Sequence, residues 1–185
     1  ERFEKDEDEP MSKVGMSALY TKTSEGKILR KINEENRNKL ISLYKEYHDS
    51  FKDLVDESLR NNNITVIVDC HSFPSLPRIY EPDSSSNRPD ICIGVDDYHT
   101  PKELAATLKN NFESIGYSVK INSPFSGSIV PIEYYNKDKR VVSVMIEVNR
   151  KVYMDEKMFL KKKDFTNISK TISRCVIKSL NEFVK

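Results

Sequence analysis

Residues 64–69 read Ile-Thr-Val-Ile-Val-Asp, a continuous apolar run rich in β-branched side chains. Such a run favours a strand, and its unbroken apolar character is typical of a central strand buried on both faces of a parallel or mixed sheet. It follows a segment from Leu29 to Asn61 in which apolar residues recur at steps of three and four, the spacing of an amphipathic helix, with Asn36 as a weak interruption. The alternation then continues, with predicted strands at 91–93, 117–121 and 141–148 and predicted helices at 100–116 and 166–183. The hydroxyl of Thr100 is expected to cap the first of these two helices. The sequence therefore predicts layers of an α/β fold.

Length and charge limit the classes of protein to which the chain can belong. Its 185 residues match the ordinary size of a single domain. The 30 Lys and Arg residues nearly balance the 29 Asp and Glu residues, and a net charge of +1 argues against a nucleic-acid binder, which needs a basic face. No stretch is apolar over the roughly 18 residues of a membrane span, and no apolar signal segment opens the chain. We therefore expect a cytoplasmic domain with no nucleic-acid or membrane partner.

The cysteines support the same location. Cys70, Cys92 and Cys175 are odd in number and lack the paired spacing of a cysteine zinc site. We expect free, buried thiols in a reducing compartment.

Two polar clusters follow predicted strands, and the first contains His71. In open α/β sheets, ligands bind beyond the carboxyl ends of the strands. His71 stands two residues after the run 64–69, and Asp69 lies on the same side of the chain by the strand period of two. A neutral imidazole held by a carboxylate is a good metal ligand, so His71 is a candidate ligand or catalyst. The alternative is a histidine that hydrogen-bonds to loop backbone.

The second cluster contains Glu147 and Arg150. Glu147 interrupts the apolar run 141–148, where a carboxylate is costly unless it is paired and where burial favours the basicity that a general base needs. The alternative is an exposed residue on an edge strand. Arg150 supplies a fixed cation for a carboxylate, either that of Glu147 or that of a substrate.

The stretch 123–128, Ser-Pro-Phe-Ser-Gly-Ser, is the third candidate. It is a tight turn in any reading. Its hydroxyls and N–H groups at Ser123, Ser126 and Gly127 could also bind a ligand.

Several of these segments together resemble the N-formylglutamate amidohydrolase family. The resemblance rests on Asp-Cys-His71-Ser, on 93–100 with Gly94 and His99, on 122–127, and above all on 146–156, which contains Glu147 and Arg150. Glu1-Arg2-Phe3, residues 6–11 and residues 15–23 also resemble this family, so the similarity covers nearly the whole chain.

The resemblance implies a three-layer α/β/α fold around a central mixed, mostly parallel sheet, like that of the zinc carboxypeptidases. It implies zinc-dependent hydrolysis of N-formyl-L-glutamate to formate and L-glutamate, a late step of one histidine-degradation route. His71 matches a metal-binding histidine, and Glu147 matches the general base. Arg2 matches an arginine suited to a substrate carboxylate, and Arg150 would assist it.

The sequence departs from the family pattern in two places. Family members carry a segment before the Glu-Arg-Phe motif that completes the metal ligands, so we expect residues 1–185 to form a single amidohydrolase-like domain from a longer protein, with the other zinc ligands upstream of residue 1. In addition, Gly127-Ser128 stands where a Gly-Gly pair is commoner, and no histidine follows in 129–140. Two alternatives therefore remain: a zinc deacylase or peptidase for another N-acyl amino acid or peptide, and a non-catalytic binding domain that has lost the metal.

Overall fold

The computed structural model describes residues 2–81 and 83–184 and divides the chain into two compact units. The first unit comprises residues 1–65, 78–81 and 129–141, and the second comprises residues 66–77, 82–128 and 142–185.

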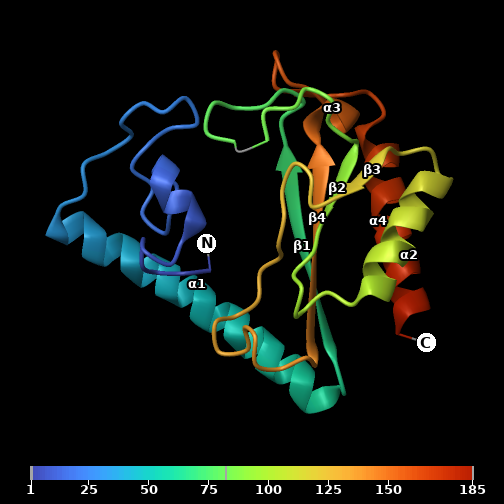
Figure 1. Ribbon diagram of the computed structural model, residues 1–185, viewed down its shortest axis with the longest axis horizontal. Coiled ribbons are helices and arrows are strands. Elements are labelled where there is room, and N and C mark those ends of the chain that lie inside the picture. Colours follow the sequence, from blue (N-terminus) through green and yellow to red (C-terminus); the bar gives the residue numbers. More distant parts are fainter. Residues whose placement is uncertain (1, 82, 185) are drawn as a thin grey trace. The chain divides into compact units, whose positions relative to one another are not determined.

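The second unit is built on a four-stranded sheet. Its strand order is β1 (Thr65–Phe73), β4 (Val141–Asn149), β2 (Ile91–Gly94) and β3 (Val119–Ile121). The arrows of β1 and β4 point the same way in Figure 1, β4 and β2 are antiparallel, and β2 and β3 are parallel. The sheet is therefore mixed and mostly parallel, as expected.

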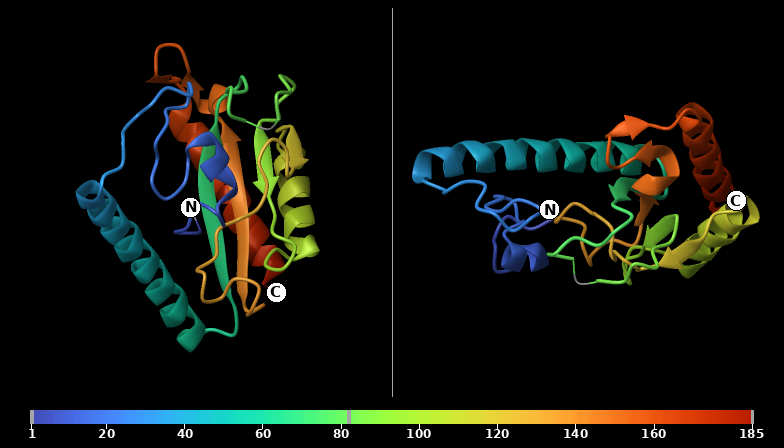
Figure 2. Two further views of the ribbon diagram at one scale, coloured as in Figure 1. Left: turned by 60° about the vertical axis from the view of Figure 1, so that its left-hand side comes forward. Right: turned by 90° about the horizontal axis from the view of Figure 1, so that it is seen from above.

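Helices α2 (Lys102–Ser114) and α4 (Phe165–Phe183) cover one face of this sheet, as both views in Figure 2 show. Alternate residues of β4, Val142, Val144 and Ile146, form one apolar core with Leu108 and Phe112 of α2. All five side chains are buried. Burial of this face stabilises the unit and leaves the opposite face of the sheet to the odd-numbered residues of β4.

Short elements follow β4. Helix α3 (Arg150–Tyr153) leads into the two-stranded sheet of β5 (Met154–Asp155) and β6 (Leu160–Lys161). Asn149 caps α3 by accepting a hydrogen bond from the N–H of Lys151.

The first unit contains the 3₁₀ helix η1 (Pro10–Val14) and the long helix α1 (Glu34–Asn61). Helix α1 begins five residues later than the apolar spacing from Leu29 predicted. Asn33 and Asn36 each accept a hydrogen bond from the other's N–H at 2.9 Å, and this reciprocal cap fixes the start of the helix. Asn36 therefore helps to begin the helix and does not interrupt it.

Two further expectations about local structure were wrong. The run 64–69 was expected to form a central strand buried on both faces. β1 instead runs from Thr65 to Phe73 and is an edge strand of the sheet among the residues that the structure describes, where its half-buried surface accepts polar side chains. The hydroxyl of Thr100 was expected to cap α2. It instead donates to the carbonyl of Ser143 at 2.6 Å, and α2 begins without a side-chain cap.

Within residues 2–81 and 83–184, no helix combines the length and the apolar character needed to cross a membrane. The three cysteines are free; Cys92 and Cys175 are buried, as expected, but Cys70 is exposed.

Candidate functional site

The carboxyl ends of β1 and β4 lie side by side, and this arrangement brings the two predicted polar clusters together. Arg150, directly after β4, donates from Nε to the hydroxyl of Ser72 at 3.3 Å and from a terminal nitrogen to the carbonyl of Ser72 at 3.2 Å. Ser72 belongs to β1. The sequence signal at the strand ends thus corresponds to one place in the fold.

The face of the sheet opposite α2 and α4, here called the site face, carries three of the candidate side chains, those of Asp69, His71 and Glu147. Val66 and Val68 of β1 pack with the apolar core beneath the helices. By the strand period of two, Asp69 and His71 therefore point to the site face. Glu147 does so from β4 by the same argument.

His71 lies within β1, not beyond a strand as expected, and is paired with Asp69. Nε2 of His71 is 2.7 Å from Oδ1 of Asp69. The hydrogen bond with Asp69 and the negative charges of Asp69 and Glu147 raise the pKa of His71, and burial opposes them only in part. A carboxylate on Nε2 orients the ring and leaves Nδ1 able to bind a ligand.

Glu147 is buried on the site face near the carboxyl end of β4, with only 7% of its surface exposed. Its register partner in β2 is Cys92, and paired residues of neighbouring strands point to the same face. The alternative of an exposed edge position is excluded, because β4 lies between β1 and β2. The position is that of a buried carboxylate on the strand next to the one that carries His71.

Cys92 lies between Glu147 and the predicted ligand loop. Its thiol donates to the carbonyl of Phe125 at 3.2 Å. Burial, together with the charge of Glu147, raises the pKa of Cys92, which keeps the thiol protonated as a donor.

The stretch 123–127 also lies in the second unit. Two of its three predicted binding residues use the predicted donor group in a hydrogen bond within the protein. Ser123 donates to a carboxylate oxygen of Asp83 at 3.2 Å, and the N–H of Gly127 donates to the carbonyl of Val95 at 3.2 Å. Ser126 is exposed. Of these three residues, Ser126 is the one whose side chain is exposed, so its hydroxyl is accessible to a ligand.

Arg2 belongs to the first unit. Its guanidinium carbon lies 3.8 Å from the centre of the Tyr135 ring, and its carbonyl accepts a hydrogen bond from Tyr44 at 2.7 Å. Glu1 of the same motif lies outside the described residues. The proposed role of Arg2 toward a substrate stays a prediction.

The residues present fit part of a metal site. His71 with Asp69 behind it has the arrangement of a single metal ligand. However, among the described residues no group of three His, Cys, Asp or Glu side chains could hold a metal ion. The part of the chain that the structure describes therefore does not by itself supply the three protein ligands of a catalytic zinc ion.

A cavity of about 430 Å³ lies beside His71. Its wall includes Ser72 of β1, Tyr153 of α3 and the apolar side chains of Phe165 and Ile172. Glu147 is not part of its lining.

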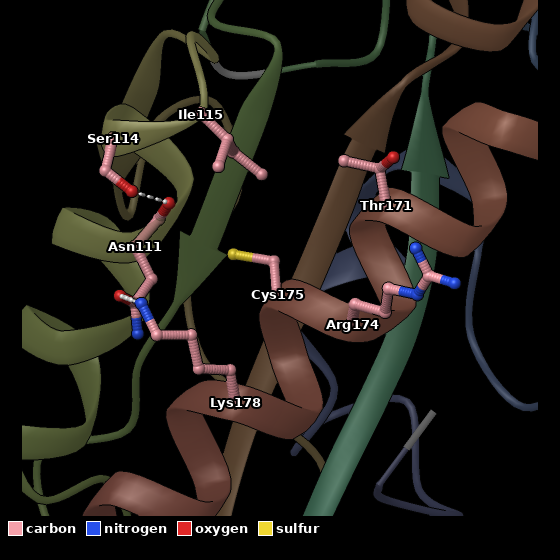
Figure 3. A pocket seen from close by; sticks show the side chains of 7 residues that line it. All are labelled: Asn111, Ser114, Ile115, Thr171, Arg174, Cys175 and Lys178. Carbon is pink, nitrogen blue, oxygen red and sulfur yellow. Dashed lines mark hydrogen bonds between the residues drawn. The ribbon is translucent and has the colours of Figure 1, made fainter.

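A second cavity, of about 260 Å³, lies between α2 and α4 (Figure 3). Cys175 points into it, and Lys178 donates to Asn111 at 2.9 Å across its lower end. None of the predicted site residues lines it.

Sequence reasoning missed Cys92 and Gly94 as parts of the site. A glycine inside a strand often marks a close backbone approach, and Gly94 at the end of β2 carried this signal. Cys92 carried none, because a buried cysteine is ordinarily a small apolar side chain.

The fold and the site define an α/β domain with a histidine–carboxylate pair and a buried carboxylate on one sheet face. The sequence model described as N-formylglutamate amidohydrolase matches residues 1–154, and the chain belongs to this family. No curated protein matches the sequence.

Two solved structures are similar to the chain. The N-formylglutamate amidohydrolase from Ralstonia eutropha JMP134 has a TM-score of 0.71 and 19% identity, over 90% of this chain and 62% of that one. The gene product Atu2144 from Agrobacterium tumefaciens has a TM-score of 0.61 and 17% identity, over 89% of this chain and 62% of that one. The predicted α/β fold with a mixed, mostly parallel sheet flanked by helices is thereby confirmed. The chain spans less than two thirds of either structure.

Proposed function

We propose that the full-length protein hydrolyses the formamide bond of N-formyl-L-glutamate and releases formate and L-glutamate. The observation that carries the proposal is the site face, where the buried carboxylate of Glu147 in β4 and the His71–Asp69 pair, joined at 2.7 Å, lie on neighbouring strands. Membership of the N-formylglutamate amidohydrolase family supports the same reaction.

Glu147 is proposed as the general base. It would take a proton from the water whose oxygen attacks the formyl carbon and then deliver that proton to the nitrogen as the C–N bond breaks. Its burial suits this task, because the carboxylate is held by the strand and is weakly solvated.

Two arginines are proposed to bind the substrate's carboxylates. Arg150 is fixed at the end of β4 by its bonds to Ser72, and Arg2 presents a guanidinium that is already stacked on Tyr135. A guanidinium binds a carboxylate in bidentate fashion, which orients as well as attracts it. Ser126 would add a hydroxyl from the neighbouring loop.

We further propose that the full-length protein binds zinc, with His71 as one ligand and the remaining ligands outside these 185 residues. When bound, zinc acidifies a water and polarises a carbonyl oxygen. The proposed role of Asp69 is to hold the imidazole of His71 in one orientation.

A substrate panel tests the assignment. The zinc-loaded full-length protein should hydrolyse N-formyl-L-glutamate at least tenfold more efficiently, by kcat/KM, than N-acetyl-L-glutamate or N-formyl-L-methionine. The proposed arginines would favour a second carboxylate over the methionine side chain, and a site fitted to a formyl group would disfavour the larger acetyl group. A preference for either of the other substrates would replace this proposal with that of a different deacylase. Binding of N-formyl-L-glutamate without turnover would indicate a non-catalytic binding domain.

A further inference from the structure

The site face is crossed by residues 122–127, here called the 122–127 loop, and the loop backbone comes very close to the sheet at Gly94. A Cβ atom on Gly94 would overlap the carbonyl oxygen of Gly127 and the methyl group of Met145. Met145 is the register partner of Gly94, so both lie on the site face. The side chain of Met145 can move, but the carbonyl belongs to the loop backbone. Only glycine at position 94 therefore allows the loop its present position.

Cys92 makes a second attachment, two residues earlier on the same face of β2. Its thiol donates to the carbonyl of Phe125 at 3.2 Å, in the middle of the loop. Cys92 is completely buried and faces Glu147 across the strand pair. One side chain thus contacts the loop and adjoins the proposed base.

The two ends of the loop are also tied to β2 and the residue after it. The N–H of Asn122 donates to the carbonyl of Ile93 at 2.9 Å, and its side-chain oxygen accepts from the N–H of Val95 at 2.8 Å. The N–H of Gly127 donates to the carbonyl of Val95 at 3.2 Å. These bonds hold the ends of the loop, whereas Cys92 contacts its middle at Phe125 and Gly94 sets how closely its end at Gly127 approaches the site face.

We infer that Gly94 and Cys92 are positioning residues, which hold the 122–127 loop at a fixed place beside Glu147 and so determine how tightly the substrate binds. The inference rests on the proposed function. Neither residue needs to touch the substrate. Gly94 acts by leaving room for the Gly127 carbonyl, and Cys92 acts by donating to the Phe125 carbonyl. The exposed Ser126 lies between these two attachment points and would move with them.

The test uses variants of the full-length protein and two readouts. Gly94→Ala should raise KM for N-formyl-L-glutamate about tenfold or more with kcat within about threefold, because a displaced loop weakens binding in the ground state and transition state alike. Cys92→Ala should raise KM by about threefold to tenfold, and Cys92→Ser, which keeps a donor, should restore most of the affinity. The second readout is amide hydrogen exchange of a peptide covering 122–127, which should be faster in Gly94→Ala and Cys92→Ala.

Gly116→Ala is the matched control. Gly116 has a φ of +92° with open space around it, so alanine there strains the backbone without touching the loop. This variant should lose stability while KM and the exchange of 122–127 stay at wild-type values. Altered KM and exchange in the control would assign the effect to general loosening and overturn the inference.

The outcomes separate this inference from the proposed function. An active enzyme with unchanged KM and unchanged exchange in folded Gly94→Ala and Cys92→Ala overturns the inference and leaves the function standing. If the wild-type protein does not hydrolyse the substrate, the proposed function fails, and unchanged exchange in the same variants overturns the loop attachment independently. If Gly94→Ala does not fold, Cys92→Ala and its serine counterpart decide the question with the same readouts.

Discussion

Replacing Glu147 by glutamine separates its chemistry from its packing. Glu147 is only 7% exposed, so a smaller side chain would leave a cavity in the site face. Glutamine avoids this, because it has nearly the same volume and keeps an oxygen acceptor. The amide cannot accept a proton from water, and loss of a general base typically lowers kcat by about 10²–10⁴-fold. At about 1.36 kcal/mol for each factor of ten, a hundredfold loss corresponds to about 2.7 kcal/mol of transition-state stabilisation.

Although kcat falls, the unfolding free energy of the same variant should rise or stay unchanged. A buried carboxylate loses solvation on folding, whereas an amide loses less. The unfolding free energy of Glu147→Gln in urea should therefore equal that of the wild type within about 1 kcal/mol or exceed it.

The assay is steady-state release of formate by the full-length protein, with urea unfolding of the same samples. Glu103→Gln provides the control, because Glu103 is an exposed carboxylate in the first turn of α2. The control should keep its kcat. Near-normal kcat in Glu147→Gln would refute the assignment of Glu147 as the base and leave it a structural partner within the site face.

Three further predictions concern the metal, the pH dependence of stability and the core. His71→Ala should reduce the zinc content of the full-length protein, measured by metal analysis, well below the one equivalent per chain expected for the wild type, and full retention would exclude His71 as a ligand. Burial acts to raise the pKa of Asp90, but hydrogen bonds from the hydroxyl and N–H of Ser118 and the charge of Lys151 outweigh it and lower the pKa. Asp90→Asn should therefore cost about 0.5–1.5 kcal/mol above roughly pH 4, and the difference from the wild type in urea melts should vanish as the pH falls through the lowered pKa; a difference that persists in acid would contradict this cause. Phe112→Ala removes a fully buried ring from the core under α2 and should cost about 3–5 kcal/mol in the same melts, so a loss below about 1 kcal/mol would mean that the core has been assigned wrongly.

Much of the fold could be predicted because the signals are local and strong. The run 141–148 became β4 with one additional residue, and 166–183 became α4 with one additional residue at its start. Element boundaries were less predictable, because they depend on individual hydrogen bonds. The reciprocal cap of Asn33 and Asn36 set the start of α1, and the bond from Thr100 to Ser143 removed the expected cap of α2.

The site could be predicted in part. The strand period placed Asp69 beside His71, and the hydrogen bond between them confirms it. The place of β1 at the edge of the sheet could not be predicted, because β-branched residues favour central strands and edge strands alike. The roles of Cys92 and Gly94 depend on a loop about thirty residues away in sequence, and a local pattern contains no information about such a contact.

Formate release from N-formyl-L-glutamate by the zinc-loaded full-length protein, followed by proton NMR, tests the central claim most directly. The account predicts that formate and L-glutamate appear in equal amounts, at a rate that falls at least about a hundredfold in Glu147→Gln. Absence of formate from a folded protein that contains one zinc per chain would contradict the account.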